Sequence, residues 1–208
     1  MKTVPLVGIL ATAFVAAVAD QEADLTVRLE APEAWKGETI TLPPGFAPDM
    51  KIRGIEEIRF APGMFQATSD SFFSYISVFR IDGGPEFTEA VVRDESLVYY
   101  RGLAAAVLGA DKVDVKKFAL ELKQVKTATA GVTASVGKLQ WTEPFVTKQP
   151  QALRLETQTW RAKKYRHLLC SVSPTAPTAA IWKDLHEIRD KFLQTNGRVA
   201  ATGKWPSS

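Results

Sequence analysis

The chain has 208 residues, and its 26 lysine or arginine and 23 aspartate or glutamate side chains give a formal net charge of +3. This near balance provides no global attraction to nucleic acid or to an anionic membrane, so only local patches could supply one. The single cysteine, Cys170, excludes an intramolecular disulfide, and the fold must therefore be stabilised by its apolar core.

The N-terminal segment has the features of a secretory signal peptide. Lys2 is followed by an uncharged apolar run that ends in the small-x-small pattern Ala17-Val18-Ala19. The run is short for a membrane span, so we expect cleavage after Ala19, which would leave 189 of the 208 residues. An uncleaved N-terminal anchor is the alternative. Export without disulfides suits a bacterial periplasm better than a eukaryotic extracellular setting, and the signal peptide predicts a periplasmic or secreted protein.

The remaining sequence predicts one domain, because no long repeat, low-complexity tract or Ser/Gly linker divides it. The expected organisation is a signal peptide (1–19), a lead-in segment (20–37), a single α+β domain (38–196) and a C-terminal tail (197–208). No further apolar run is long enough to cross a membrane after cleavage. The oligomeric state stays open.

Three strands are predicted in the first half of the domain. Residues 38–42 alternate between polar and apolar side chains, and residues 55–60 form a second short run; each ends at a turn containing proline and glycine. Residues 72–81 are apolar on both faces. This pattern predicts a strand in the middle of a sheet, covered on each side.

A helix is predicted over residues 86–108, where the apolar period changes, and Gly109 would end it. We expect Arg93, Asp94 and Glu95 on its polar side. The small side chains of 104–106 would allow a close approach to the sheet. The predicted apolar stripe consists of Phe87, Ala90, Val91, Leu97, Val98 and Leu108.

The second half returns to an alternating pattern. Strands are predicted over 118–125, 132–141, 153–160 and 165–172, and the last two form a hairpin through the sequence RAKK. A closing helix begins near Pro177 and ends at Asn196-Gly197. Its apolar stripe is predicted to be Ile181, Leu185, Ile188 and Phe192.

The predicted order is therefore β-β-β-α-β-β-β-β-α, which indicates an α+β fold: a mostly antiparallel sheet of about six or seven strands with two main helices packed on it. This arrangement, with an amphipathic helix after YRHLLCSVSP, resembles the α-β sandwich of the photosystem accessory protein PsbP and its relatives. The resemblance covers most of residues 38–194. It is architectural, and it transfers no site residue to this chain.

The histidines, the cysteine and the paired carboxylates do not form a recognisable catalytic or metal-binding set. His167 and Cys170 would point to opposite faces of one strand, and Cys170 is predicted to be a small buried side chain. His186 is expected on the polar side of the last helix near Asp190. Glu56 and the carboxylate that follows it would diverge. No catalytic residue, metal or cofactor is predicted.

The sequence WRAKKYRH contains the most distinctive group of charges. It would place basic and aromatic side chains at a hairpin tip, where they could contact an anionic partner such as lipid headgroups, a cell-wall polymer or an acidic protein. A solvated turn protected by lysine is the alternative. The candidate residues are Trp160, Arg161, Lys163, Lys164, Tyr165 and Arg166.

A second candidate surface lies in the loops of residues 42–70, where FAPDM and FAPGM nearly repeat each other. Proline stiffens such loops, while Phe and Met form an adaptable apolar surface. We expect the two turns to lie near one another. Loops that only cap the core are the alternative. The candidate residues are Phe46, Met50, Phe60, Met64 and Phe65.

These patterns predict an exported, non-catalytic binding or accessory module of the cell envelope. Its partner would be a protein or an apolar or anionic ligand, and nucleic acid is not expected. The alternative is a hydrolase-type enzyme of the cell envelope, with a site assembled from distant carboxylates and His186. A subunit of a larger assembly is a third reading. Exposed Phe and Met would favour binding, and a deep pocket joining carboxylates to His186 would favour the enzyme.

Overall fold

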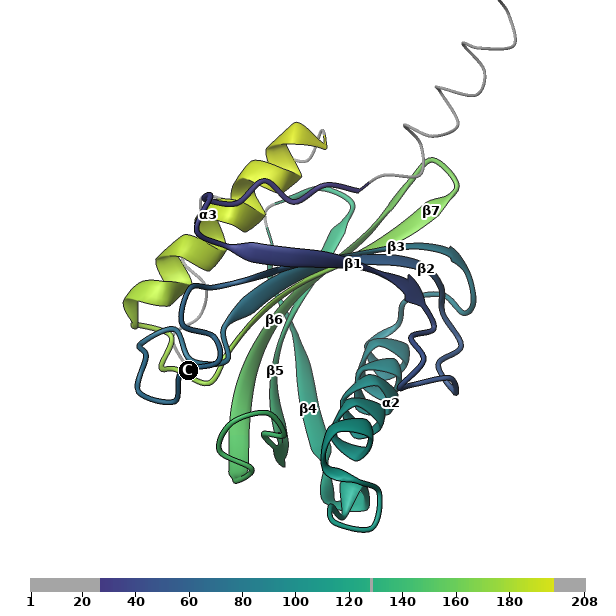
Figure 1. Ribbon diagram of the computed structural model, residues 1–208. Helices are drawn as coiled ribbons and strands as arrows, with labels where there is room; N and C mark the ends of the chain where they lie inside the picture. Colours follow the sequence, from purple (N-terminus) through teal and green to yellow (C-terminus); the bar gives the residue numbers. More distant parts are fainter. Residues whose placement is uncertain (1–26, 128, 197–208) are drawn as a thin grey trace, which may run out of the picture.

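The computed structural model describes residues 27–127 and 129–196. These described residues form one antiparallel sheet and two α-helices, so the fold is mixed α+β, and the order of elements agrees with the sequence prediction (Figure 1). The elements are β1 (Lys36–Leu42), β2 (Arg53–Phe60), β3 (Tyr75–Gly83), α2 (Glu89–Leu108), the short 3-10 helix η1 (Val115–Lys117), β4 (Ala119–Val125), β5 (Val132–Thr142), β6 (Pro150–Ala162), β7 (Tyr165–Ser173) and α3 (Ala180–Thr195).

The seven strands form a single sheet in the order β1-β2-β3-β7-β6-β5-β4. Each neighbouring pair is antiparallel. Because β7 pairs with both β3 and β6, it joins the N-terminal strands to the C-terminal strands in the middle of the sheet.

Strand β3 occupies the central position that its sequence predicts. Tyr75 and Phe79 point into the core beneath α2, whereas Ile76 and Val78 belong to the core beneath α3. The strand begins later than expected, because Phe73 has a φ of 47° and lies in the turn before it. Both faces of β3 are therefore covered, as the doubly apolar pattern predicted.

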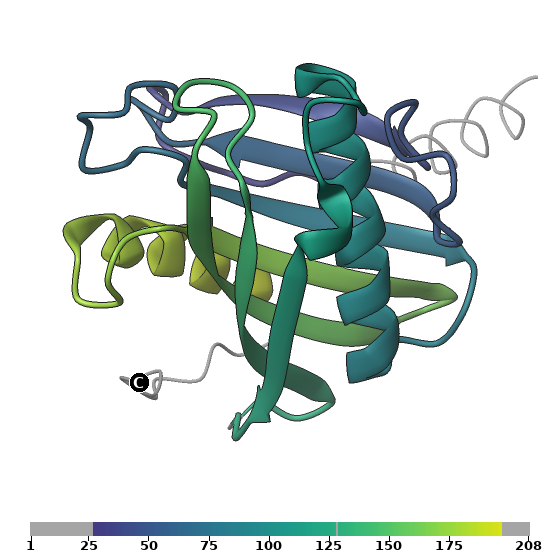
Figure 2. The same ribbon diagram turned by 90° about the horizontal axis from the view of Figure 1, so that it is seen from below.

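The two helices cover opposite faces of the sheet (Figure 2). The predicted stripe of α3 is confirmed, since Ile181, Leu185, Ile188 and Phe192 are all buried. The described part of the lead-in segment, from residue 27 onward, packs on the same face, where Leu29 and Trp35 join the α3 core. Burial of this apolar area is the main contribution to stability on that side.

The predicted apolar stripe of α2 is confirmed only in part, because Phe87, Leu97, Val98 and Leu108 are half-buried against the core but are not the residues buried most deeply. The helix buries Val92, Glu95, Tyr100 and Ala104, while Ala90 is exposed. Glu95 was expected on the polar side because charged residues are rarely buried without partners. Its partners are backbone N–H groups from a loop that is distant in the sequence. The spacing of apolar residues along α2 therefore could not predict that Glu95 is buried.

The two FAP turns lie at opposite ends of the sheet, which corrects the expectation that they are neighbours. In the antiparallel register of β1 and β2, Leu42 is opposite Gly54 and Lys36 is opposite Phe60. The turn after β1 and the turn after β2 are consequently separated by the length of a strand. Each of the two similar sequences follows the end of a strand. Because successive strands run in opposite directions, the two turns lie at opposite ends of the sheet.

The loop of residues 43–52 packs directly against α2. Glu95 accepts hydrogen bonds from the backbone N–H groups of Lys51 (2.9 Å) and Ile52 (3.3 Å). Gly102 allows close approach, because an added Cβ would overlap the carbonyl oxygen of Phe46 and lie 3.0 Å from Ala47 Cα. The loop is therefore a fixed cover over one end of the helix–sheet interface.

Within the residues that the structure describes, no helix is long and apolar enough to span a membrane. The predicted signal peptide (1–19) and C-terminal tail (197–208) lie outside those residues.

Candidate functional site

The candidate apolar residues fall into two separate groups. Phe46 contacts Tyr99 with ring centroids 5.0 Å apart, and Met50 is buried in the core next to α2. At the other end of the sheet, Met64 is buried and Phe60 is half-buried. Phe65 alone among the five is strongly exposed, with 52% of its surface accessible. The five residues therefore do not form one surface, and Phe65 is the member that is strongly exposed.

Phe65 belongs to an exposed apolar surface that extends across two loops. Its ring lies 5.6 Å from that of Phe145 in an edge-to-face arrangement, although the two residues come from the β2–β3 and β5–β6 connections. Phe145 and Val146 are each 38% exposed. We call Phe65, Phe145 and Val146 the aromatic tip. Large apolar side chains gathered on loop ends are typical of contact surfaces.

Phe145 and Val146 were not predicted from the sequence. The sequence does contain one signal for them. They are adjacent apolar residues in a connection bounded by Pro144 and Pro150, and they belong to no predicted strand face or helix stripe. Such a pair could equally fill the core. Only the contact with Phe65, from a loop far away in the chain, distinguishes the two alternatives.

The β5–β6 half of the aromatic tip is held in place by Glu143. This fully buried carboxylate accepts hydrogen bonds from the backbone N–H groups of Phe145 (2.6 Å), Val146 (3.0 Å) and Thr147 (2.6 Å). It also accepts one from Thr147 Oγ1 at 2.9 Å. Charge-assisted bonds of this kind are stronger than neutral ones, so the loop is ordered before any partner arrives.

The β2–β3 half is a series of tight turns. Phe73 N donates to the Met64 carbonyl oxygen at 2.9 Å, and the Ser71 hydroxyl bonds the Pro62 carbonyl oxygen. Gly63 adopts a φ of 85°, which glycine reaches without steric cost. These contacts fix the base of the loop that presents Phe65.

The aromatic residues of the predicted basic tip are buried. Trp160 stacks on His167 with ring centroids 5.0 Å apart and planes 7° apart. Tyr165 receives the guanidinium of Arg80 4.5 Å from its ring centroid. These two aromatic side chains are thus occupied by the protein itself, and a partner at the hairpin would not reach them.

The arginines of the basic tip form ion pairs with another part of the chain. Arg161 and Arg166 both pair with Glu86, and Arg166 additionally donates to the Gly84 carbonyl oxygen at 2.8 Å. The hydrogen bond from Arg161 lowers the pKa of the Glu86 carboxyl. Lys163 and Lys164 are the exposed residues at the turn itself. The hairpin is confirmed, and its accessible charge consists of this lysine pair and of Arg161, whose exposed side chain is paired with Glu86.

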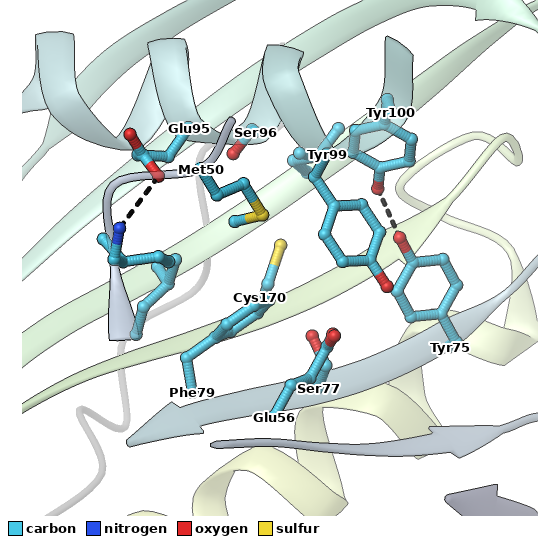
Figure 3. Close-up of a pocket in the computed structure, with 13 residues that line it drawn as sticks. Met50, Glu56, Tyr75, Ser77, Phe79, Glu95, Ser96, Tyr99, Tyr100 and Cys170 are labelled. Atoms are coloured by element: carbon cyan, nitrogen blue, oxygen red, sulfur yellow. Dashed lines mark hydrogen bonds between the residues drawn. The ribbon is translucent and has the colours of Figure 1, made fainter. Parts of the chain in front are cut away.

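A cavity lies between α2 and the sheet, beneath the loop of residues 43–52 (Figure 3). The space open to the centre of a water molecule is about 30 Å³, room for one or two waters. Side chains from the loop, α2 and the sheet converge on it. Its polar lining includes Glu56, Ser77, Tyr75, Tyr99, Tyr100 and Glu95, together with the sulfur atoms of Met50 and Cys170.

Burial dominates the acid–base chemistry of this cavity. Loss of hydration raises the pKa of Glu56 to about 7, against hydrogen bonds from Tyr99 and Ser77 that lower it. Burial also raises the pKa of the Cys170 thiol well above its usual range, so it is not a thiolate nucleophile. Cys170 is therefore the small buried side chain that was predicted, and His167 lies on the opposite face.

His186 is half-buried and paired with the sheet, which corrects its predicted place beside Asp190 on a solvated face. Its Nε2 atom lies 2.7 Å from Oε2 of Glu156, which is 1% exposed. Asp190 instead accepts a hydrogen bond from Arg189 at 2.6 Å. Arg154 Nε is 3.1 Å from the other oxygen of Glu156. The pairing crosses 30 positions of sequence, so the helix pattern of α3 could not indicate it.

A further prediction concerns the adjacent carboxylates. Glu56 faces α2, whereas Glu57 pairs with Arg59, so the adjacent carboxylates diverge as expected. In residues 27–127 and 129–196, no three His, Cys, Asp or Glu side chains gather in a group that could hold a metal ion. No protein-family model matches the chain, and a search of curated proteins found no match.

Proposed function

We propose that this protein is an exported, non-catalytic binding module of the cell envelope that contacts an apolar partner through the aromatic tip. The observation that supports it is the exposure of Phe65 and Phe145 on loops whose own hydrogen bonds fix their conformation. Aromatic side chains contribute much of the binding energy of protein interfaces. Loops that are already ordered lose little conformational entropy on binding.

Export is proposed from the sequence of residues 1–19, which has the features of a cleaved signal peptide, with the periplasm or the secreted fraction as destination. We further propose that the fold is an α-β sandwich of the kind that PsbP-like proteins have. Its support is the packing of α2 on one face of the sheet and of α3 on the other.

A hydrolase-type enzyme is the second candidate. The contact between His186 Nε2 and Glu156 favours it, because a buried carboxylate is the usual group that orients a catalytic histidine. The same carboxylate also bonds Arg154 and lies 3.7 Å from Arg189, a set that equally anchors α3 to β6. Replacing His186 with Ala would abolish an activity that depends on this pair, and would leave binding through the aromatic tip intact.

Binding through the aromatic tip is tested by partner capture with matched surface variants. The purified protein is immobilised as wild type and as the double variant Phe65→Ser/Phe145→Ser, and bound proteins from a cell-envelope extract are quantified. We expect the double variant to lose the partner at least about tenfold, as removal of central aromatic contacts does.

Two controls separate this result from general effects. Val107→Ser removes another exposed apolar side chain, 44% accessible and located on α2, and should retain the partner. Lys163→Glu/Lys164→Glu reverses the charge of the lysine pair at the hairpin and should also retain the partner. Retention by the Phe65→Ser/Phe145→Ser variant, or loss in the lysine variant alone, would reject the aromatic tip.

A further inference from the structure

The cavity beneath the loop of residues 43–52 has an excess of acidic groups. Its 13 lining residues include the carboxylates of Glu56 and Glu95 and contain no lysine, arginine or histidine. Glu95 is occupied by the backbone N–H groups of Lys51 and Ile52. When Glu56 is ionised, no cationic side chain in the cavity lining balances its charge.

One oxygen of Glu56 is available to a ligand. The side chain is 1% exposed, and its Oε2 atom has no hydrogen-bond partner among the described residues. Figure 3 shows the carboxylate directed toward the space that Tyr99 and Cys170 border. An uncompensated carboxylate in such a place is costly, so a cation that reaches it gains both a charge-assisted hydrogen bond and charge neutralisation.

Aromatic groups complete the surroundings. Tyr75, Tyr99 and Tyr100 lie along one side of the cavity and Phe79 contributes to its floor, while the hydroxyls of Tyr75 and Tyr100 bond each other. Ring faces attract a small cation, and this attraction grows where water is excluded. Phenolic oxygens can also accept hydrogen bonds from it.

We infer that this cavity binds a small ammonium-type cation, with the carboxylate of Glu56 as its counter-ion and the tyrosines as its aromatic and hydroxyl contacts. The available space of about 30 Å³ suits a group the size of a water molecule, such as an ammonium ion. A hard divalent metal ion fits poorly, because it requires about six or more oxygen ligands.

Proton binding should compete with this cation. The pKa of Glu56 is raised to about 7 by burial, so the carboxyl is neutral in mildly acidic solution and ionised in mildly alkaline solution. Ammonium affinity should therefore rise as pH increases through neutrality. The titratable groups that surround Glu56 are Glu38 from β1, Tyr75 from β3, Glu95, Tyr99 and Tyr100 from α2, and Cys170 from β7.

The test measures urea unfolding of the full chain in ammonium chloride and in sodium chloride at equal ionic strength. At about pH 8, ammonium at roughly ten times its Kd should lower the unfolding equilibrium constant about tenfold. The effect should be much smaller at about pH 5.5 and absent in Glu56→Gln. Glu57→Gln removes the adjacent carboxylate on the other face and should keep the response.

A direct observation on the wild type makes the test independent of the variants. A bound 15N-ammonium signal should appear at alkaline pH, with nuclear Overhauser contacts to the ring protons of Tyr99 and Tyr75. Equal stabilisation by sodium, persistence of the response in Glu56→Gln, or a saturating ammonium concentration with no bound signal would each overturn the inference. Capture through the aromatic tip would be unaffected by any of these results.

Discussion

Glu56 and Glu143 are both nearly inaccessible to solvent, but their immediate surroundings differ. Glu143 accepts bonds from three successive backbone N–H groups and one hydroxyl, which replace the hydration lost on folding. Glu56 has hydroxyl contacts and one oxygen without a partner among the described residues. The first carboxylate organises a loop, whereas the second makes the core sensitive to pH.

The protein should lose stability as pH rises, and Glu56 should be responsible. Burial raises its pKa in the folded chain from 4.5 to about 7, so its contribution to the free energy of unfolding is fully present below pH 4.5 and is lost as pH rises through 7. The loss is about 3 kcal/mol, since each pKa unit corresponds to roughly 1.4 kcal/mol. Urea unfolding between about pH 4 and pH 8 measures it.

The comparison with Glu56→Gln isolates this contribution. The variant keeps a hydrogen-bonding side chain of similar size but cannot ionise, so its stability should fall about 3 kcal/mol less than the wild type over the same range. Other titrating groups, including Glu57, are common to both proteins and cancel in the difference. Parallel pH profiles for the two proteins would contradict the assignment.

Replacing Glu143 with Ala should loosen the aromatic tip. The backbone N–H groups of Phe145, Val146 and Thr147 would lose their common acceptor, and the expected cost is about 1–3 kcal/mol. Hydrogen exchange of these three amides should accelerate. Glu121→Ala, an exposed carboxylate on β4, is the control and should leave their exchange unchanged. Unaltered protection in Glu143→Ala would mean that the loop is ordered by its packing alone.

At the scale of elements, the sequence predicts strands better than it predicts the faces of α2. Alternation along a strand is a local property, and β3 and the β6–β7 hairpin follow it closely. The stripe of α3 is also local, since Leu185 and Ile188 meet one continuous apolar core. The face that α2 buries depends on Glu95 and on a loop more than 40 positions away, and no window of the helix contains that information.

The candidate surfaces show the same limit. Phe65 was identified as a surface residue, but its neighbour Phe145 arrives from another loop. Trp160 and Tyr165 were expected to be accessible because their neighbours are charged, yet the sheet continues to the turn and buries both. Whether a side chain in a hairpin is exposed depends on the residues that pack against it from other strands and helices. The local sequence pattern does not contain this information.

Gly102→Ala should destabilise the protein, although alanine is the better helix former. Propensity alone would add up to about 1 kcal/mol of stability. The new Cβ would overlap the Phe46 carbonyl oxygen, and relief requires separating α2 from the loop of residues 43–52. We expect a net loss of about 1–3 kcal/mol.

Urea unfolding with a matched glycine checks this expectation. Gly45 belongs to the same loop and has open space where a Cβ would be placed, so Gly45→Ala should be close to neutral. If Gly102→Ala were as stable as Gly45→Ala, the contact between α2 and the loop would be looser than the structure indicates.

At the scale of the whole molecule, the antiparallel sheet separates two chemically different ends. One end presents the aromatic tip, formed by the β2–β3 and β5–β6 loops. The other holds the loop of residues 43–52 and the β6–β7 turn with Lys163 and Lys164, because β1 ends and β7 begins there. None of the three aromatic-tip residues lines the cavity that we propose to bind ammonium, so the two sites can be tested separately.

The central claim, recognition through the aromatic tip, is tested most directly by photo-crosslinking in the producing cells. A photoreactive phenylalanine analogue is placed at Phe65 in one strain and at Val107, the exposed control position on α2, in another. We predict a discrete crosslinked product from position 65 and none of that mass from position 107. The same products from both positions, or none from position 65, would contradict the proposed function.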